Sequence, residues 1–192
     1  MKRLLTMLLI CCLGIIGCQT KDVSTKKTTL DDSKLTLTDK NMPKEVNPKI
    51  YKPVSLEKTK EVIPYTPKLP PNPLKGYEPI QQFYIEDWGQ KQKIAIETKI
   101  IPDKSNQNTL GIYSLRIANF PDYPSDIINK KQYTKEITLK NNINVYYRDY
   151  QLAWKENNIE YLISYILDNN ASNNMGQKQI EDRLVEFANS MK

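Results

Sequence analysis

Apolar and polar residues alternate along much of the chain from residue 76 to residue 192. In the clearest case, Ile94 to Ile100, every second side chain is isoleucine or threonine, and alanine, glutamate and lysine lie between them. This period of two predicts a strand with one buried face. Similar alternation predicts five more strands, over residues 80–86, 110–118, 133–139, 143–154 and 159–167. Asn157-Asn158 separates the last two and, because asparagine tolerates positive φ, predicts a two-residue hairpin turn.

The period changes close to the C-terminus. Apolar residues there recur at the spacing of one helical face, and they are Ile180, Leu184, Phe187, Ala188 and Met191. This stripe predicts an amphipathic helix over Gln177–Met191. The expected fold is α+β, a curved antiparallel sheet of about six strands with the C-terminal helix packed on one face. A domain over 76–192 is long enough to bury about two-thirds of its unfolded surface and to fold alone.

Residues 18–75 lack this alternation. Gln19 to Asn41 is polar with only scattered leucine and valine, too little to form a core. Eight of the twelve prolines then fall between Pro43 and Pro73, and proline has no N–H to donate to a helix or a sheet. The sequence predicts a disordered tether, whose proline-rich half would reach roughly 90 Å at about 3.1 Å per residue. The alternative is a polyproline ligand for a partner protein.

The first residues carry the pattern of an export signal. A positively charged start precedes an apolar run over residues 4–16, which has signal-peptide length and is too short to span a bilayer comfortably. The lipobox is a four-residue pattern of an aliphatic residue, a position that accepts many residue types, glycine or alanine, and cysteine. The chain fits it at Ile15-Ile16-Gly17-Cys18. We expect a signal peptide over 1–17, cleavage between Gly17 and Cys18, and a diacylglycerol and palmitate-type anchor on Cys18. The alternatives are an uncleaved membrane anchor and an ordinary signal peptide.

This anchor would hold an exported, extracellular protein on the outer face of the cytoplasmic membrane. The many lysine, asparagine and isoleucine residues are typical of an AT-rich genome and favour a Gram-positive source. The net charge of +6 is uneven, since residues 19–75 carry +5 and residues 76–192 carry −1. Nucleic-acid binding, which needs a basic patch on a folded surface, therefore loses its support. A basic tether suits anionic lipids or wall polymers, and the alternative is a merely solvated segment.

The residue inventory excludes several kinds of catalytic and metal site. The chain has no histidine, and its three cysteines are Cys11, Cys12 and Cys18. The first two lie in the signal peptide and the third would carry the lipid, so no disulfide is expected. Cys–His and Ser–His–Asp catalysis and thiolate or imidazole metal sites are excluded as well. We expect no catalytic residue, no cofactor and no metal.

Tyrosine is the one chemically distinctive surplus, with twelve in the chain. Six aromatic residues, Tyr147 among them, crowd the last two predicted strands. The five singled out as candidates are Tyr146, Tyr150, Trp154, Tyr161 and Tyr165. Such side chains could line a groove for a sugar, a peptide or a lipid chain. The alternative is ordinary core and cross-strand packing with the hydroxyl groups at the rim.

Three segments carry a family resemblance. They are Ala153-Trp154-Lys155-Glu156-Asn157-Asn158-Ile159-Glu160-Tyr161-Leu162-Ile163-Ser164, Leu184-Val185-Glu186-Phe187-Ala188-Asn189-Ser190-Met191 and Pro73-Leu74-Lys75-Gly76-Tyr77. Together they resemble an uncharacterised domain found at the C-termini of Gram-positive lipoproteins and in extracellular parts of anti-sigma-factor-like and sporulation-related membrane proteins. The chain departs from that pattern at Gly176-Gln177-Lys178-Gln179, where the family has serine or threonine followed by acidic residues. The resemblance implies an open antiparallel sheet with a packed helix and brings no catalytic residue.

These observations predict a membrane-anchored surface lipoprotein that binds an unidentified protein partner or senses the envelope without catalysing a reaction. One alternative is a carrier or chaperone of an apolar, lipid-like ligand held between sheet and helix. Another is a hydrolase that uses only carboxylates and tyrosines, which would need two carboxylates converging in a cleft.

Overall fold

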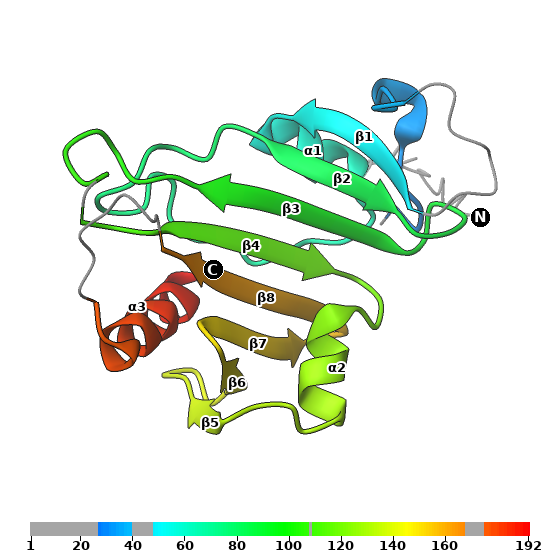
Figure 1. Ribbon diagram of the computed structural model, residues 1–192. Helices are drawn as coiled ribbons and strands as arrows, with labels where there is room; N and C mark the ends of the chain where they lie inside the picture. The colour runs from blue at the N-terminus through cyan, green and yellow to red at the C-terminus, as the bar shows by residue number, and fades with distance from the viewer. Residues whose placement is uncertain (1–26, 40–47, 108, 168–174) are drawn as a thin grey trace, which may run out of the picture.

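The computed structural model describes residues 27–39, 48–107, 109–167 and 175–192. Its centre is an antiparallel sheet of eight strands in the order β1-β2-β3-β4-β8-β7-β6-β5 (Figure 1). The strands are β1 Lys49–Val54, β2 Phe83–Asp87, β3 Ile94–Ile100, β4 Ile112–Ala118, β5 Lys135–Thr138, β6 Asn144–Arg148, β7 Gln151–Glu156 and β8 Ile159–Ile166. The helices are the short 3-10 turn Asp32–Lys34, α1 Leu56–Val62, α2 Tyr123–Asn129 and α3 Gln177–Ser190. The α+β class and the antiparallel sheet with a C-terminal helix are confirmed.

Period-two alternation builds the core face of the sheet. Ile96 of β3 lies opposite Ile117 of β4, and Leu115 of β4 lies opposite Ile163 of β8, and all four side chains are buried. The predicted hairpin at Asn157-Asn158 is confirmed, since both residues have positive φ, 50° and 62°, between the paired strands β7 and β8. Local pattern and cross-strand pairing therefore agree in the centre of the sheet.

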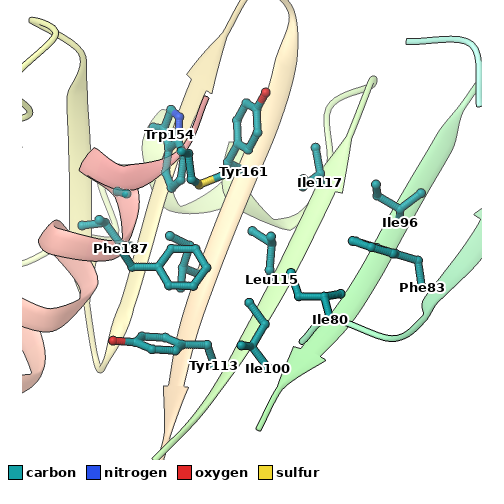
Figure 2. Packing of buried hydrophobic residues seen from close by; sticks show 14 of the residues in the cluster. Ile80, Phe83, Ile96, Ile100, Tyr113, Leu115, Ile117, Trp154, Tyr161 and Phe187 are labelled. Atoms are coloured by element: carbon teal, nitrogen blue, oxygen red, sulfur yellow. The ribbon is translucent and has the colours of Figure 1, made fainter. Parts of the chain in front are cut away.

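Helix α3 covers part of this core face through the predicted stripe. Ile180 and Leu184 are fully buried, and the Phe187 ring lies 4.7 Å from the Tyr113 ring, centroid to centroid. Figure 2 shows Phe187 reaching from the helix over Leu115 and Tyr113. Burial of this face against the sheet, rather than intrinsic propensity, holds the helix in place.

Helix α2 lies on the opposite face of the sheet. It buries Ile127 against Ala153 of β7 and Leu162 of β8, with Tyr133 and Tyr146 at the margin. Because this cluster is small, α2 covers only part of its face. The remainder, called the open face below, carries the candidate site.

The sheet differs from the expected one in strand number and shape. The predicted strand 143–154 is two strands, because Asp149 and Tyr150 have positive φ, 43° and 64°, and turn the chain between β6 and β7. The buried positions change phase there, from Val145 and Tyr147 to Leu152 and Trp154. The eight-stranded sheet is open and does not curl around α3 (Figure 1). Its core face is wider than one helix, and other segments cover the rest.

Those other segments come from the predicted tether, so the tether prediction is wrong for residues 48–75. Edge strand β1 pairs with β2, and it tolerates Pro53 because the pairing is irregular there and the N–H that proline lacks is not needed in the ladder. Ser55 caps α1 by accepting a hydrogen bond from the Lys58 N–H (3.2 Å). Leu30 is also buried, and its N–H donates to the Lys91 carbonyl at 2.7 Å.

Residues 63–80, called the strap below, follow α1 across the core face (Figure 1). The Tyr65 hydroxyl donates to the Ile117 carbonyl at 3.1 Å, and the Lys68 N–H donates to the Tyr161 hydroxyl at 3.1 Å. Leu69 and Lys192 exchange two backbone hydrogen bonds of 3.0 Å. Several prolines thus lie in a segment that satisfies its polar groups against the sheet instead of extending into solvent.

Two further findings concern the membrane. Gly17 and Cys18, the predicted cleavage and lipidation residues, lie outside the described residues. Within the part of the chain that the structure describes, no helix is both long and apolar enough to cross a bilayer.

Candidate functional site

The open face carries the outward-pointing residues of the central strands. On this face lie Tyr84 and Glu86 of β2, Glu97 and Lys99 of β3, Ser114 and Arg116 of β4, and Leu162 and Ser164 of β8. These positions alternate with the buried isoleucines and tyrosines of the core face, as successive residues of a strand must. The face is therefore rich in hydrogen-bonding groups at the centre of the sheet.

Arg116 is the centre of an ion-pair cluster on the open face. Its Nη2 lies 2.9 Å from Glu86 Oε2, its Nε 2.7 Å from Asp122 Oδ2, and its Nη1 3.5 Å from Glu97 Oε2. The Arg116 side chain is only 15% exposed. Burial alone would lower the pKa of Arg116, but the hydrogen bonds to Glu86 and Asp122 more than offset it and raise the pKa. The guanidinium therefore stays charged and fixed in direction.

Four separate elements bring these charges together. Glu97 and Arg116 are direct cross-strand partners in β3 and β4, an arrangement that favours opposite charges. Glu86 comes from the next strand, and Asp122 is the N-cap residue of α2. The Asp122 N–H donates to Glu160 Oε2 at 2.9 Å, and the Ser125 hydroxyl donates to the same carboxylate. Glu160, which is almost fully buried, thus fixes the start of α2 beside the cluster.

Two exposed aromatic side chains border the cluster. The Trp88 Nε1–H donates to Glu86 Oε2 at 2.8 Å, and the Trp88 ring lies 6.1 Å from the Phe120 ring, centroid to centroid. Tyr123, the first residue of α2, accepts a 2.5 Å hydrogen bond on its hydroxyl from Arg148 Nη2. Trp88 is 37% exposed and Tyr123 44% exposed. Both rings are held by polar contacts while part of each faces solvent.

Together these residues form a groove of about 420 Å³, called the Arg116 groove below. Its lining is Trp88, Glu97, Ser114, Arg116, Asp122, Tyr123, Leu162 and Ser164. The volume is within the range of about 300–1,000 Å³ that is common for ligand sites. The groove offers carboxylate acceptors, guanidinium and hydroxyl donors, and two aromatic walls. Because Arg116 bridges the carboxylates, the arrangement is suited to binding rather than to general acid–base chemistry.

A second hollow, of about 560 Å³, lies beside α3. Tyr77, Tyr113 and Phe187 line its floor but are almost fully buried. Burial also raises the pKa of Tyr113 to about 12, so its hydroxyl stays protonated at neutral pH. The rim carries charged side chains, among them Arg183 and Glu186. The floor is therefore packed and the rim polar, which does not favour a lipid chain.

The five aromatic residues singled out from the sequence do not form one groove. Trp154, Tyr161 and Tyr165 lie in the core, where the Trp154 and Tyr161 rings stack with centroids 4.8 Å apart (Figure 2). Tyr146 lies on the opposite face against Tyr133, 4.8 Å between ring centroids. Tyr150 lies in the β6–β7 turn and is 39% exposed. For the three core residues, the packing interpretation holds.

Sequence reasoning missed Trp88, Arg116 and Tyr123. One usable signal was the alternation itself, since it places Arg116 and Glu97 on the polar face of adjacent strands. The neighbouring carboxylates Glu86 and Asp87 point to opposite faces of β2, as successive residues of a strand must. Glu86 joins the Arg116 cluster, and Asp87 is buried and accepts hydrogen bonds from the Gly89 and Lys91 N–H groups at 2.9 and 3.1 Å.

The described residues contain no group of three or more acidic or cysteine side chains placed to hold a metal ion. The Arg116 groove combines an ion-pair cluster with partly exposed aromatic walls and is the candidate site considered below. Comparison of the chain with protein-family models, with curated proteins and with solved structures finds no match.

Proposed function

We propose that the protein is an exported lipoprotein, anchored through Cys18 to the outer face of the cytoplasmic membrane, whose domain binds a ligand without catalysis. The observation that carries the binding role is the Arg116 groove, where Trp88 and Tyr123 stay exposed around a fixed polar floor. Exposed aromatic groups clustered around directed polar groups are typical of binding surfaces. The lipobox at Ile15-Ile16-Gly17-Cys18 supports the anchor.

The packing of the N-terminal residues changes the expected distance from the membrane. Leu30 is buried, and the Asp31 N–H donates to the Val62 carbonyl at 2.9 Å, so the domain begins close to Lys27. Residues 19–26 are then the whole link to Cys18, and even fully extended they span at most about 30 Å. We therefore propose a domain held close to the bilayer instead of at the end of a long arm.

The anchor is tested by replacing Cys18 with alanine in the source bacterium and fractionating the cells. We expect Cys18→Ala to accumulate as an uncleaved precursor or to leave the membrane fraction, with loss of labelling by a fatty-acid analogue. Cys12→Ala is the matched control, because Cys12 lies within the predicted signal peptide, and it should mature and fractionate like wild type. A Cys18→Ala protein that matures and is labelled normally would contradict the proposal.

The carrier of an apolar ligand is the second hypothesis, and the hollow beside α3 is the observation in its favour. Against it, Ile180, Leu184 and Phe187 fill the interface between α3 and the sheet. An apolar ligand would have to displace these side chains or lie against the charged rim. The Arg116 groove therefore supports the binding module better than the hollow supports the carrier.

A further inference from the structure

We infer that the Arg116 groove binds an uncharged oligosaccharide, so that hydroxyl groups and the C–H face of a sugar ring meet its polar floor and aromatic walls. This inference rests on the proposed binding function and names the class of ligand. It is carried by three features of the groove: its carboxylates already contact Arg116, its hydrogen-bonding groups are fixed, and its aromatic rings are held partly exposed.

The charges around the groove argue for an uncharged ligand. Glu86, Glu97 and Asp122 all lie within 3.5 Å of one guanidinium, that of Arg116, so this cluster alone has two negative charges in excess. Lys99 on the same face and Arg148 at the Tyr123 hydroxyl offset that excess beside the groove. An anionic ligand would approach three carboxylates, and a cationic ligand that used Glu86 or Asp122 would compete with Arg116 for them. A desolvated ion pair that loses one partner leaves the other charge uncompensated, which is strongly unfavourable. A neutral ligand can use the same groups without breaking the pairs.

The groups remain able to bind hydroxyls although they are paired. An ionised carboxylate has about four acceptor sites, and Glu97, 35% exposed, uses only the 3.5 Å contact to Arg116 and a 3.2 Å hydrogen bond from the Ser114 hydroxyl among the contacts described. Ser164 Oγ accepts a 3.2 Å hydrogen bond from Gln151 Nε2, which leaves its own proton free to be donated. A sugar hydroxyl both donates and accepts, so it can meet either kind of partner.

The β-strands set the spacing of these groups. Ser114 and Ser164 are direct cross-strand partners, and Gln151 follows Ser164 on β7. Neighbouring strands lie about 4.8 Å apart, so the row offers hydrogen-bonding groups at regular steps across the groove. A chain of linked sugar rings presents hydroxyls at repeated positions, which fits a repeated row better than it fits a single isolated contact.

The two aromatic rings supply the apolar part of the site. The Trp88 indole is held by its hydrogen bond to Glu86 and by the Phe120 ring, and the Tyr123 hydroxyl is held by Arg148. Ligand binding therefore orders few additional side chains, which favours affinity. One face of a pyranose ring is lined by C–H groups and packs on such rings. A large protein partner is less suited, because glutamate and aspartate, three of which surround Arg116, are depleted in the core of a protein interface.

The test titrates the full-length lipoprotein, purified in detergent, with fully N-acetylated chitotetraose and with cellotetraose, both uncharged, using isothermal titration calorimetry. We expect at least one oligosaccharide to bind with a dissociation constant between micromolar and millimolar. Trp88→Ala and Tyr123→Ala should each weaken that binding about tenfold, as expected for aromatic residues at the centre of a site. Tyr150→Ala is the matched control, since Tyr150 is an equally exposed tyrosine outside the groove, and it should change binding less than about twofold.

Circular dichroism checks that each variant is folded. Because Trp88 and Tyr123 are both partly exposed, either substitution alone tests the groove if the other variant is unstable. The inference is overturned if neither oligosaccharide binds at millimolar concentration, if Trp88→Ala and Tyr123→Ala bind like Tyr150→Ala, or if only a charged probe such as tetralysine or a sulfated tetrasaccharide binds. Failure here leaves the fractionation of Cys18→Ala unchanged, so the ligand class and the anchor are tested separately.

Discussion

At the scale of single residues, Arg116 is the charged side chain on which the open face depends. Its contacts to Glu86, Glu97 and Asp122 come from two other strands and the start of α2. These ion pairs are mostly shielded from solvent. Exposed ion pairs add little to the free energy of unfolding, whereas breaking a buried pair lowers it strongly, and the Arg116 pairs lie between the two cases. Removing Arg116 would leave three carboxylates facing one another.

Replacing Arg116 with alanine should therefore lower the free energy of unfolding by about 2–3 kcal/mol. Urea denaturation followed by circular dichroism measures this loss. Lys130→Ala is the control, because its 3.1 Å pair with Asp126 joins two side chains that are both more than half exposed, and it should change stability by less than about 0.5 kcal/mol. Equal effects of the two substitutions would show that the Arg116 cluster adds no more than a surface pair.

The aromatic residues show at this scale why residue type alone did not locate the site. Tyr161 and Tyr123 are both tyrosines in strand or helix segments, yet Tyr161 is buried against the strap and Tyr123 is exposed. The face of the sheet on which a side chain lies decides between the two roles. That face follows from the register of the strands and from what covers them, which are properties of the folded chain.

At the scale of elements, the hairpins decide how many strands the sheet contains. Asn157 and Asn158 carry a recognisable turn signal, whereas Asp149-Tyr150 in the β6–β7 turn does not, and this second turn was missed. The change in phase of buried residues around it was present in the sequence. It could be interpreted only once Leu152 and Trp154 were known to share a face with Tyr147.

The positive φ of 62° at Asn158 makes a specific stability prediction. Asn158→Ala should lower the free energy of unfolding by about 1 kcal/mol, because a β-carbon is disfavoured in the left-handed region and alanine lacks the local hydrogen bonds of asparagine. Thermal unfolding measures the shift. Asn141→Ala is the control, since Asn141 is an exposed turn asparagine outside the positive-φ set, and it should have little effect. If both variants melt alike, backbone conformation at Asn158 is not the cause.

At the scale of the whole molecule, the strap and the N-terminal elements complete the core instead of connecting it to the membrane. Tyr51, Val62 and Ile63 are buried at 3% exposure or less and lie in the core cluster with strands β2 to β4. Each such side chain contributes about 1.5–3 kcal/mol by burial. Their sum is comparable with the total stability of an ordinary domain, about 5–15 kcal/mol.

A chain of residues 76–192 should therefore fail to fold cooperatively, although the sequence alone suggests that it is a complete domain. A chain of residues 27–192 is the matched control and should show a single cooperative transition. Thermal denaturation followed by circular dichroism, together with binding of a hydrophobic dye, measures the difference. If the shorter chain melts like the longer one, residues 27–75 are the tether that their composition predicts.

Elements with a local pattern could be predicted from the amino-acid sequence. Strand β3 follows from a repeat of every second residue, the hairpin from the two adjacent residues Asn157 and Asn158, and α3 from apolar residues three or four positions apart. The structure confirms all three elements. The lipobox at Cys18 is a local pattern of the same kind and stays a prediction. Such patterns can be read directly because the physical interactions behind them act over a few residues.

Tertiary structure alone decided the rest. Edge strand β1 contains Pro53 and lacks regular alternation of apolar and polar residues, and it is a strand because β2 offers it an edge to pair with. The strap is ordered because its backbone groups find partners on the core face, such as Tyr161 and Lys192. The Arg116 groove likewise joins residues from β3, β4, β8 and α2 with Trp88, which follows β2. These contacts connect positions far apart in the chain, so no local repeat in the sequence predicts them.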